Sequence, residues 1–174
     1  DIFVRSNAFA ALKEDGSVVT WGDLGPHPPY SELGSGVERI FSTNQSFLAL
    51  KSDGSAVFWG FDGESPDLDE DLNTYLKGVA NVFTNGRSFA ALKNDGSVIT
   101  WGNTVKKEDG YVGWVWTDSV EDKLRSGVVD IASTATAFAA LRDDGSVVTW
   151  GAGDAADSSE VSEHLLSNVN EIHS

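Results

Sequence analysis

The chain has 174 residues, of which 40% are hydrophobic and 22% are charged, so it is long enough to bury a core and is neither disordered nor fibrous. Its 27 acidic and 12 basic residues give a formal net charge of -15, which opposes binding to the phosphates of nucleic acid. The absence of cysteine excludes disulfides, thiolate metal sites and a cysteine nucleophile, and no apolar run is long enough for a membrane helix.

The sequence begins with Asp1 and contains no methionine, which predicts a processed product or a piece of a longer protein. Together with the lack of cysteine, this favours an exported or organellar protein without excluding a cytosolic one. The sequence therefore does not determine the cellular compartment.

A block of fifteen residues, AFAALKEDGSVVTWG at 8–22, recurs three times, at 46–60, 88–102 and 137–151. Each copy keeps a phenylalanine near its start and a Trp-Gly pair at its end. The spacing between equivalent positions of successive copies varies, at 38, 42 and 49 residues, and a fifth anchor position at Ile172 follows Ile131 by 41 residues. A fixed block joined by variable connectors is typical of a repeat architecture in which units stack on their neighbours.

Each block is predicted to form a β-hairpin, because an Asp-Gly pair separates two runs of β-prone residues. We expect a two-residue type I′ turn at Asp15 and Gly16, with Glu14 paired to Ser17. That register would place Trp21 opposite Ala10 on one face, and Phe9 on the other. Both faces are largely apolar, so both should be covered.

A further strand precedes three of the hairpins, in the segments 36–42, 78–84 and 127–133. Apolar residues at helical spacing precede these strands or the C-terminus, and they predict helices over 67–79 and 158–169 and a weaker one through Val120, Leu124 and Val128. The stretch PPYSELGSGV should form only a single turn. The predicted order of elements in each unit is therefore helix, strand, hairpin and loop.

The sequence predicts one repeat domain over 1–174, mainly β with short helices, as a four-repeat β-propeller-like array. The predicted units are 1–22, 30–60, 67–102 and 119–151, with a partial fifth unit at 158–174. Ile172 occupies the same repeat position as Ile2, so five first strands serve four hairpins. Three arrangements remain possible: closure into a ring, an open array that assembles with other molecules through its terminal strands, and part of a longer array in which the last strand serves the next repeat.

The repeated pattern FAALK-x-DGSVVTWG, preceded by a Val-x-x-Ile strand, resembles the regulator-of-chromosome-condensation repeat family. It is also similar to the repeats of β-lactamase inhibitor protein II and to FAALKxDGSVVTWG repeat arrays of bacterial and algal proteins. The resemblance covers about half the chain and implies β-propeller blades. Two departures are that acidic helices replace the usual Gly-Gln-Leu connector, and that there are four units where the family commonly has seven.

The longest connector, NTVKKEDGYVGWVWTDSV, is the one basic and aromatic cluster in this acidic sequence. Tyrosine and tryptophan favour binding because they bury much surface at low entropic cost. The candidate partner-binding residues are Lys106, Lys107, Tyr111, Trp114 and Trp116. The alternative is that Trp114 and Trp116 pack on the rim of the fold.

The segment that starts at Asp67 begins like a calcium-binding loop, with Asp69 and Asp71 at the expected spacing. Leu72 stands where that loop needs glycine and Gly78 where it needs a bidentate acid, so a helix N-terminus is the preferred interpretation and calcium binding stays open. The three histidines have no metal-ligand spacing, and no nucleophile elbow, phosphate loop or dinucleotide motif is present.

The sequence thus favours a non-enzymatic repeat module without a cofactor, which binds a protein or a surface ligand through its variable connectors. One alternative is a structural or accessory subunit of a larger assembly that shares strands. Another is an enzyme-inhibitor module, which rests on the resemblance alone. Nucleotide exchange, known for the chromosome-condensation family, does not carry over because no contact residues align.

Overall fold

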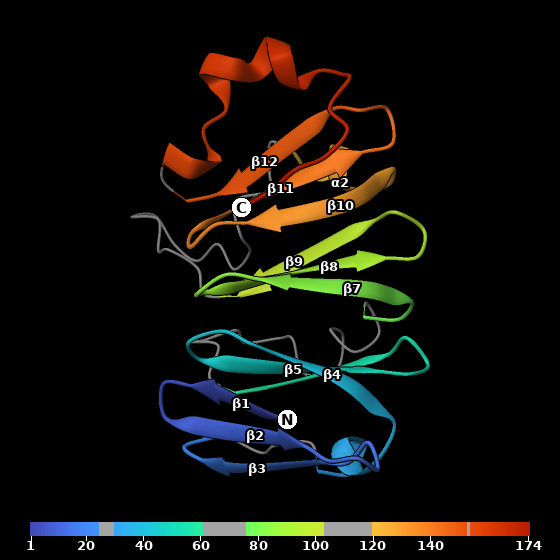
Figure 1. The fold of residues 1–174 in the computed structure, drawn as a ribbon, viewed down its shortest axis with the longest axis vertical. Coiled ribbons are helices and arrows are strands. Elements are labelled where there is room, and N and C mark those ends of the chain that lie inside the picture. Colours follow the sequence, from blue (N-terminus) through green and yellow to red (C-terminus); the bar gives the residue numbers. More distant parts are fainter. Residues whose placement is uncertain (25–29, 61–75, 103–119, 153) are drawn as a thin grey trace. The chain divides into compact units, whose positions relative to one another are not determined.

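The computed structural model describes residues 1–24, 30–60, 76–102, 120–152 and 154–174 (Figure 1). Within these ranges the strands form four three-stranded antiparallel sheets, each built from three consecutive strands.

Sheet 1 comprises β1 (Ile2–Arg5), β2 (Ala8–Leu12) and β3 (Val18–Gly22). Sheet 2 comprises β4 (Val37–Ser42), β5 (Ser46–Lys51) and β6 (Ala56–Gly60). Sheet 3 comprises β7 (Val79–Thr84), β8 (Ser88–Lys93) and β9 (Val98–Gly102). Sheet 4 comprises β10 (Val128–Ser133), β11 (Ala137–Arg142) and β12 (Val147–Gly151). The predicted mainly β, four-repeat architecture is confirmed.

The helices of the described residues are short. They are the 3₁₀ helix η1 (Glu32–Gly34), the α-helix α2 (Glu121–Leu124) and the 3₁₀ helices η2 (Asp154–Ala156) and η3 (Ser159–Leu165). The single turn expected near residue 33 is confirmed.

All three predicted helices extended too far. The helix predicted over 158–169 is the 3₁₀ helix η3, which ends at Leu165. Val79 and Val128, expected at helix ends, instead begin the strands β7 and β10. The preceding Gly78 and Gly127 have φ of 72° and 76°, in the left-handed region where a right-handed helix cannot continue. Most of the helix predicted over 67–79 lies outside the described residues.

The chain divides into two compact units, Asp1–Val79 and Ala80–Ser174. Unit 1 contains sheets 1 and 2, and unit 2 contains sheet 4 and all of sheet 3 except the first residue of β7. A single repeat domain with the boundaries given above stays a prediction.

The hairpin turns have three residues, not the two that we expected. In sheet 1, the Lys13 N–H donates to the Ser17 carbonyl at 2.9 Å, and the Gly16 N–H donates to the Lys13 carbonyl at 3.1 Å. Only Gly16 has a positive φ, of 75°, so the loop is a type I turn followed by a left-handed glycine. The Asp15 carboxylate accepts hydrogen bonds from the Ser17 N–H and hydroxyl, which hold this turn.

The extra loop residue shifts the strand pairing by one, and the expected register was wrong. Phe9 pairs with Trp21, Ala10 with Thr20 and Ala11 with Val19. Each sheet therefore has an aromatic face, which carries its Phe–Trp pair, and an opposite alanine face. In sheet 1 the aromatic face carries Ile2, Val4, Phe9, Ala11, Val19 and Trp21, and the alanine face carries Phe3, Ala8, Ala10, Leu12, Val18 and Thr20.

Each unit has a core in which an alanine face meets an aromatic face. In unit 1, residues of the alanine face of sheet 1 pack with Leu33 and with the aromatic face of sheet 2: Ala8, Ala10, Val18, Val37, Ile40, Phe47, Ala49, Val57 and Trp59. In unit 2, residues of sheet 3 pack with Leu124 and with the aromatic face of sheet 4: Ala90, Leu92, Val128, Ile131, Phe138, Ala140 and Trp150. The small alanine side chains leave room for the rings.

Arg5 ties the two sheets of unit 1 together at one edge. Its guanidinium donates to the backbone carbonyls of Gln45 and Asp23 and lies 5.6 Å from the ring centre of Phe47. Burial lowers the pKa of Arg5 below its usual value, and the Asp23 carboxylate opposes this effect. The charge is therefore held by two carbonyls and an aromatic ring.

Candidate functional site

The binding cluster predicted from the sequence lies outside the described residues. Lys106, Lys107, Tyr111, Trp114 and Trp116 all fall within 103–119. The partner-binding role of these residues stays a prediction, as does calcium binding by the segment at 67–71. The candidate site described below comes from residues that the structure does describe.

A stacked phenylalanine and tryptophan mark the aromatic face of each sheet. In sheet 1 the rings of Phe9 and Trp21 have centroids 5.2 Å apart and planes 13° apart. The other three pairs have centroid separations of 5.2, 5.2 and 5.3 Å: Phe47–Trp59, Phe89–Trp101 and Phe138–Trp150. The constant geometry follows from the register, which places the two residues directly across neighbouring strands.

The glycine after each tryptophan allows a close backbone approach. Gly22 has a φ of 100°, and a Cβ atom there would lie 2.5 Å from the carbonyl oxygen of Asn7. No other residue fits that space and that conformation. The Trp-Gly pair thus fixes the end of the hairpin, and with it the position of the ring.

One of the four pairs is exposed to solvent. Trp21 is 43% exposed, whereas Trp59, Trp101 and Trp150 are 3%, 1% and 2% exposed. Phe9 is 38% exposed, whereas its counterparts are at most 2% exposed. Three further apolar side chains of the same face are exposed, and we call the set the open face: Ile2, Val4, Phe9, Val19 and Trp21.

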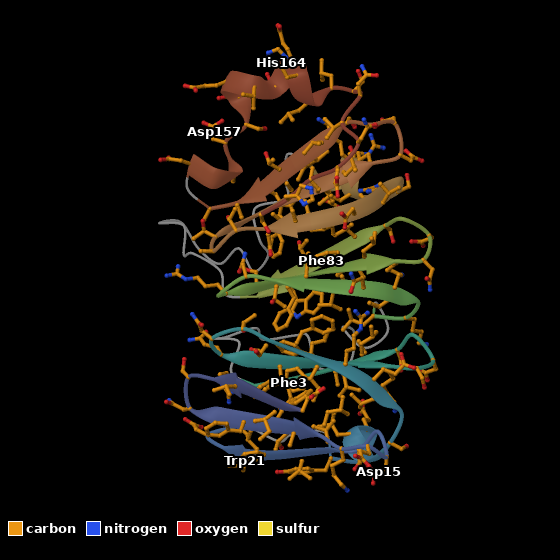
Figure 2. All side chains as sticks on the ribbon, in the orientation of Figure 1. Phe3, Asp15, Trp21, Phe83, Asp157 and His164 are labelled. Carbon is orange, nitrogen blue, oxygen red and sulfur yellow. The ribbon has the colours of Figure 1, made fainter. Side chains whose placement is uncertain are left out.

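The open face lies on the side of sheet 1 that points away from sheet 2. Figure 2 labels Trp21 on this side and Phe3 on the other side, where Phe3 packs against the core of unit 1. Ile40 and Val57, the counterparts of Ile2 and Val19 in sheet 2, are buried in that core. The open face is therefore a core surface without its covering layer.

This surface was not predicted from the sequence, because both faces of every hairpin were expected to be covered. That expectation holds for the aromatic faces that carry Trp59 and Trp150. Trp21 differs from Trp59 and Trp150 because no other sheet of the described residues packs on its ring. Stacking requires that the aromatic face of one sheet meets the alanine face of the sheet before it.

The C-terminal residues form a junction that matches those between sheets. Val37, Val79 and Val128 start the first strands of sheets 2, 3 and 4, and their N–H groups donate to Gly16, Gly54 and Gly96 in the preceding hairpin turns, each at 3.0 Å. The Val169 N–H donates to the Gly145 carbonyl at the same distance.

The backbone of this junction also matches. Asn168 has a φ of 67°, close to the 75° of Gly36 and the 76° of Gly127 at the equivalent positions. Leu165 precedes Val169 by four residues, as Leu33 precedes Val37 and Leu124 precedes Val128. We call Leu165–Val169 the C-terminal junction.

The surface around the C-terminal junction is only partly covered. Leu33 and Leu124 are buried, but Leu165, Val169 and Ile172 are half-buried and Val161 and Leu166 are exposed. Residues 170–174 form no strand in the structure. The helix η2 contacts β11 and β12 of sheet 4, and the Thr149 hydroxyl of β12 donates to the Ala156 carbonyl of η2 at 2.9 Å. This end of the chain therefore presents a second apolar surface.

The described residues provide no candidate metal site. Among them, no group of three His, Asp or Glu side chains is placed to hold a metal ion. None of the helices in these ranges is long and apolar enough to cross a bilayer. What the described surface provides is exposed apolar area on rigid strands.

No protein-family model and no curated protein matches the sequence. Among solved structures, the CRINKLY WD40 ectodomain of the Arabidopsis thaliana receptor kinase ACR4 matches with a TM-score of 0.52 and 18% identity, over 90% of this chain and 51% of that one. Prp20p from Saccharomyces cerevisiae matches with a TM-score of 0.52 and 18% identity, over 90% of this chain and 46% of that one. Yeast RCC1 (Prp20) bound to Kap60 matches equally, over 88% and 42%.

The chain spans about half the length of the structures that it matches. The identity of 18% shows the fold alone. At that level the resemblance found in the sequence is confirmed, because the repeated strand and hairpin form the same sheets. The chain has the repeat fold of the RCC1-type β-propellers.

Proposed function

We propose that this chain is a non-enzymatic repeat module that binds a protein partner, and that the open face is a binding surface. One observation carries the proposal. The Phe9–Trp21 pair has the same stacked geometry as three buried pairs, yet it is exposed to solvent. A core-quality aromatic surface that faces water is typical of a protein-binding site.

The open face is suited to binding because its side chains are already ordered. Its residues lie on three paired strands, and the cross-strand register and the Trp-Gly backbone contact set the orientation of Trp21. Binding of a partner therefore carries only a small entropic cost for ordering this surface. Tryptophan is among the residues that contribute most to protein interfaces.

The variable connectors are the second part of the proposal. Lys106, Lys107, Tyr111, Trp114 and Trp116 combine positive charge with aromatic rings in a chain of net charge -15. We infer that this cluster contributes contacts to a partner in addition to those of the open face. Loops on a rigid scaffold commonly carry recognition residues.

The solved structures support a protein-binding role for this fold in general. Yeast RCC1 (Prp20) was solved bound to Kap60, and Prp20p is described with binding properties to Gsp1p and histones. Kap60, Gsp1p and histones are partners of Prp20 and are not proposed for this chain. The net charge of -15 is our reason for leaving nucleic acid out of the proposal.

The test is affinity capture with matched variants. Bait protein carrying Val19→Glu and Trp21→Ser should lose a specifically retained protein, because both changes remove apolar area from the open face. Bait carrying Val129→Glu should retain it, since Val129 is similarly exposed but lies on β10. A third bait, with Trp114→Ala and Trp116→Ala, tests the connector. Equal retention by all baits, identified by mass spectrometry, would contradict the proposal.

A second candidate is a structural or accessory subunit of a larger assembly that shares strands. The observation that favours it is the C-terminal junction, where Val169 bonds to Gly145 as the first residue of a next strand would. Residues 170–174 follow this junction and form no strand in the structure. A segment at this position can pair as a strand with another chain.

A further inference from the structure

We propose that the partner of the open face is a second copy of this chain, which docks with its C-terminal end, so that copies associate head to tail. This inference rests on the proposed protein-binding function and names its partner. The docking end comprises the alanine face of sheet 4, η3 and the C-terminal junction.

The contact between stacked sheets has a constant composition in both units. An alanine face contributes small residues, the connector contributes one leucine, and the next sheet contributes its aromatic face. In unit 1 the leucine is Leu33, and in unit 2 it is Leu124. The interior of each unit thus shows which surface covers an aromatic face.

The two ends of the chain carry the two halves of one such contact. The open face is an aromatic face with Phe9 and Trp21 exposed. The C-terminal end has the leucine at position 165, the junction at Val169 and the alanine face of sheet 4, where Ala139 and Val147 are half-buried. Leu166, beside Leu165, is 69% exposed. Among the described residues the open face is uncovered and the C-terminal end is only partly covered, so the two surfaces match each other.

The complementarity favours opposite ends over like ends. In both cores the rings face a surface of small side chains, which lets the sheets approach closely. Two open faces would place the Trp21 rings of both copies against each other, without that room. The contact is therefore heterologous, and repeating it produces open chains or closed rings of copies.

The docking uses faces and leaves the strands of sheet 1 in place. Ile172 is the counterpart of Ile2, and β1 is already paired with β2 through Ile2 and Ala11. Residues 170–174 therefore move aside when the second copy docks. In the structure the contact between His173 Nε2 and Glu171 Oε1, at 3.2 Å, lies within the segment itself.

The experiment is sedimentation velocity on the full chain over about 1 µM to 1 mM, a range that spans weak association. Wild type should exceed its monomer mass of 18.6 kDa as the concentration rises. Trp21→Lys and Leu166→Glu should each weaken association by about tenfold or more, because each places a charge in the contact. Val129→Glu, a change at a similarly exposed residue elsewhere, should leave association unchanged.

Mixing the two variants is the decisive measurement. The Trp21→Lys protein keeps a native C-terminal end and the Leu166→Glu protein keeps a native open face, so an equal mixture should form dimers and no larger species. Association of the Leu166→Glu protein alone, with none by the Trp21→Lys protein, would show that open faces pair with each other and overturn the inference. If Trp21→Lys lacks the wild-type circular dichroism spectrum, Val19→Lys replaces it.

Removing residues 170–174 separates face docking from strand sharing. This truncation keeps Val169 and should preserve or strengthen association. If the truncated protein no longer associates, face docking is overturned in favour of strand sharing. A wild type that stays monomeric throughout would also overturn the inference. In that case continued capture of another protein by the open face would leave the proposed function standing, and loss of capture as well would remove both.

Discussion

Four aspartates, one in each hairpin turn, show how a single residue sets the local structure. Asp15, Asp53, Asp95 and Asp144 each accept hydrogen bonds from the N–H and hydroxyl of the serine two residues later. These bonds lower the pKa of all four carboxyl groups, and the pKa of Asp15 falls from 3.8 to about 2. Their place in the turn, predicted from the sequence, is confirmed, but the positive φ that a type I′ turn needs at both central residues is found only at the glycine.

The lowered pKa values predict a loss of stability in acid. A carboxyl group whose pKa is lower in the folded state stabilises the fold above its unfolded pKa of 3.8, and this stabilisation disappears as the pH falls toward about 2. Replacing the four aspartates by asparagine keeps an acceptor but removes the titration. Urea unfolding at a series of pH values should show a steeper loss for wild type than for the variant. Equal slopes would contradict this.

How much a Phe–Trp pair contributes to stability depends on whether another sheet covers the sheet that carries it. The Phe–Trp pair of sheet 2 is covered by sheet 1, and the matching pair of sheet 1 is exposed, although the two pairs have the same ring separation of 5.2 Å. Ring stacking is thus equal, while burial differs. Burial is the larger contribution to stability.

Equivalent tryptophans should therefore respond differently to truncation. Trp59→Ala removes a buried ring from the core of unit 1 and should lower the free energy of unfolding by about 3–5 kcal/mol. Trp21→Ala removes a half-exposed ring and should lower it by only about 1 kcal/mol. Urea unfolding of both variants, followed by circular dichroism, checks the difference. Similar losses would show that the open face is covered in solution.

Much of each sheet could be predicted from the sequence, because the repeated block carries its own turn and its own core residues. The hairpins, the first strands of the four sheets and the covering of Trp59, Trp101 and Trp150 were predicted correctly, whereas the fifth first strand expected around Ile172 is not formed. The pairing register was not, because an Asp-Gly pair suits both a two-residue and a three-residue loop, and the hydrogen bonds of Asp15 decide between them. The exposure of Trp21 depends on neighbouring sheets, which a single repeat does not encode.

The whole molecule combines a strong negative charge with two apolar ends. The net charge of -15 makes two copies repel each other. Near the C-terminal junction, the exposed Glu160, Glu163 and Glu171 add to that repulsion. Association between copies therefore balances apolar burial against electrostatic repulsion.

This balance predicts that salt strengthens association. Raising the ionic strength from about 0.01 M to about 1 M shortens the screening length from roughly 30 Å to roughly 3 Å, which weakens the repulsion and leaves apolar burial in place. Sedimentation of wild type should therefore show larger species at high salt than at low salt. Weaker association at high salt would mean that ion pairs, and not the open face, hold the copies together.

The bond between each valine and the preceding turn glycine has a consequence for how such a protein can diverge. This bond joins two backbone atoms at 3.0 Å at every junction, including the one at Val169. Because it does not depend on side chains, a connector can change in length and composition while the strand after it starts at the same place. Connectors can therefore change by mutation without unfolding the sheets. For the same reason, the connectors are suitable sites for grafting foreign peptides.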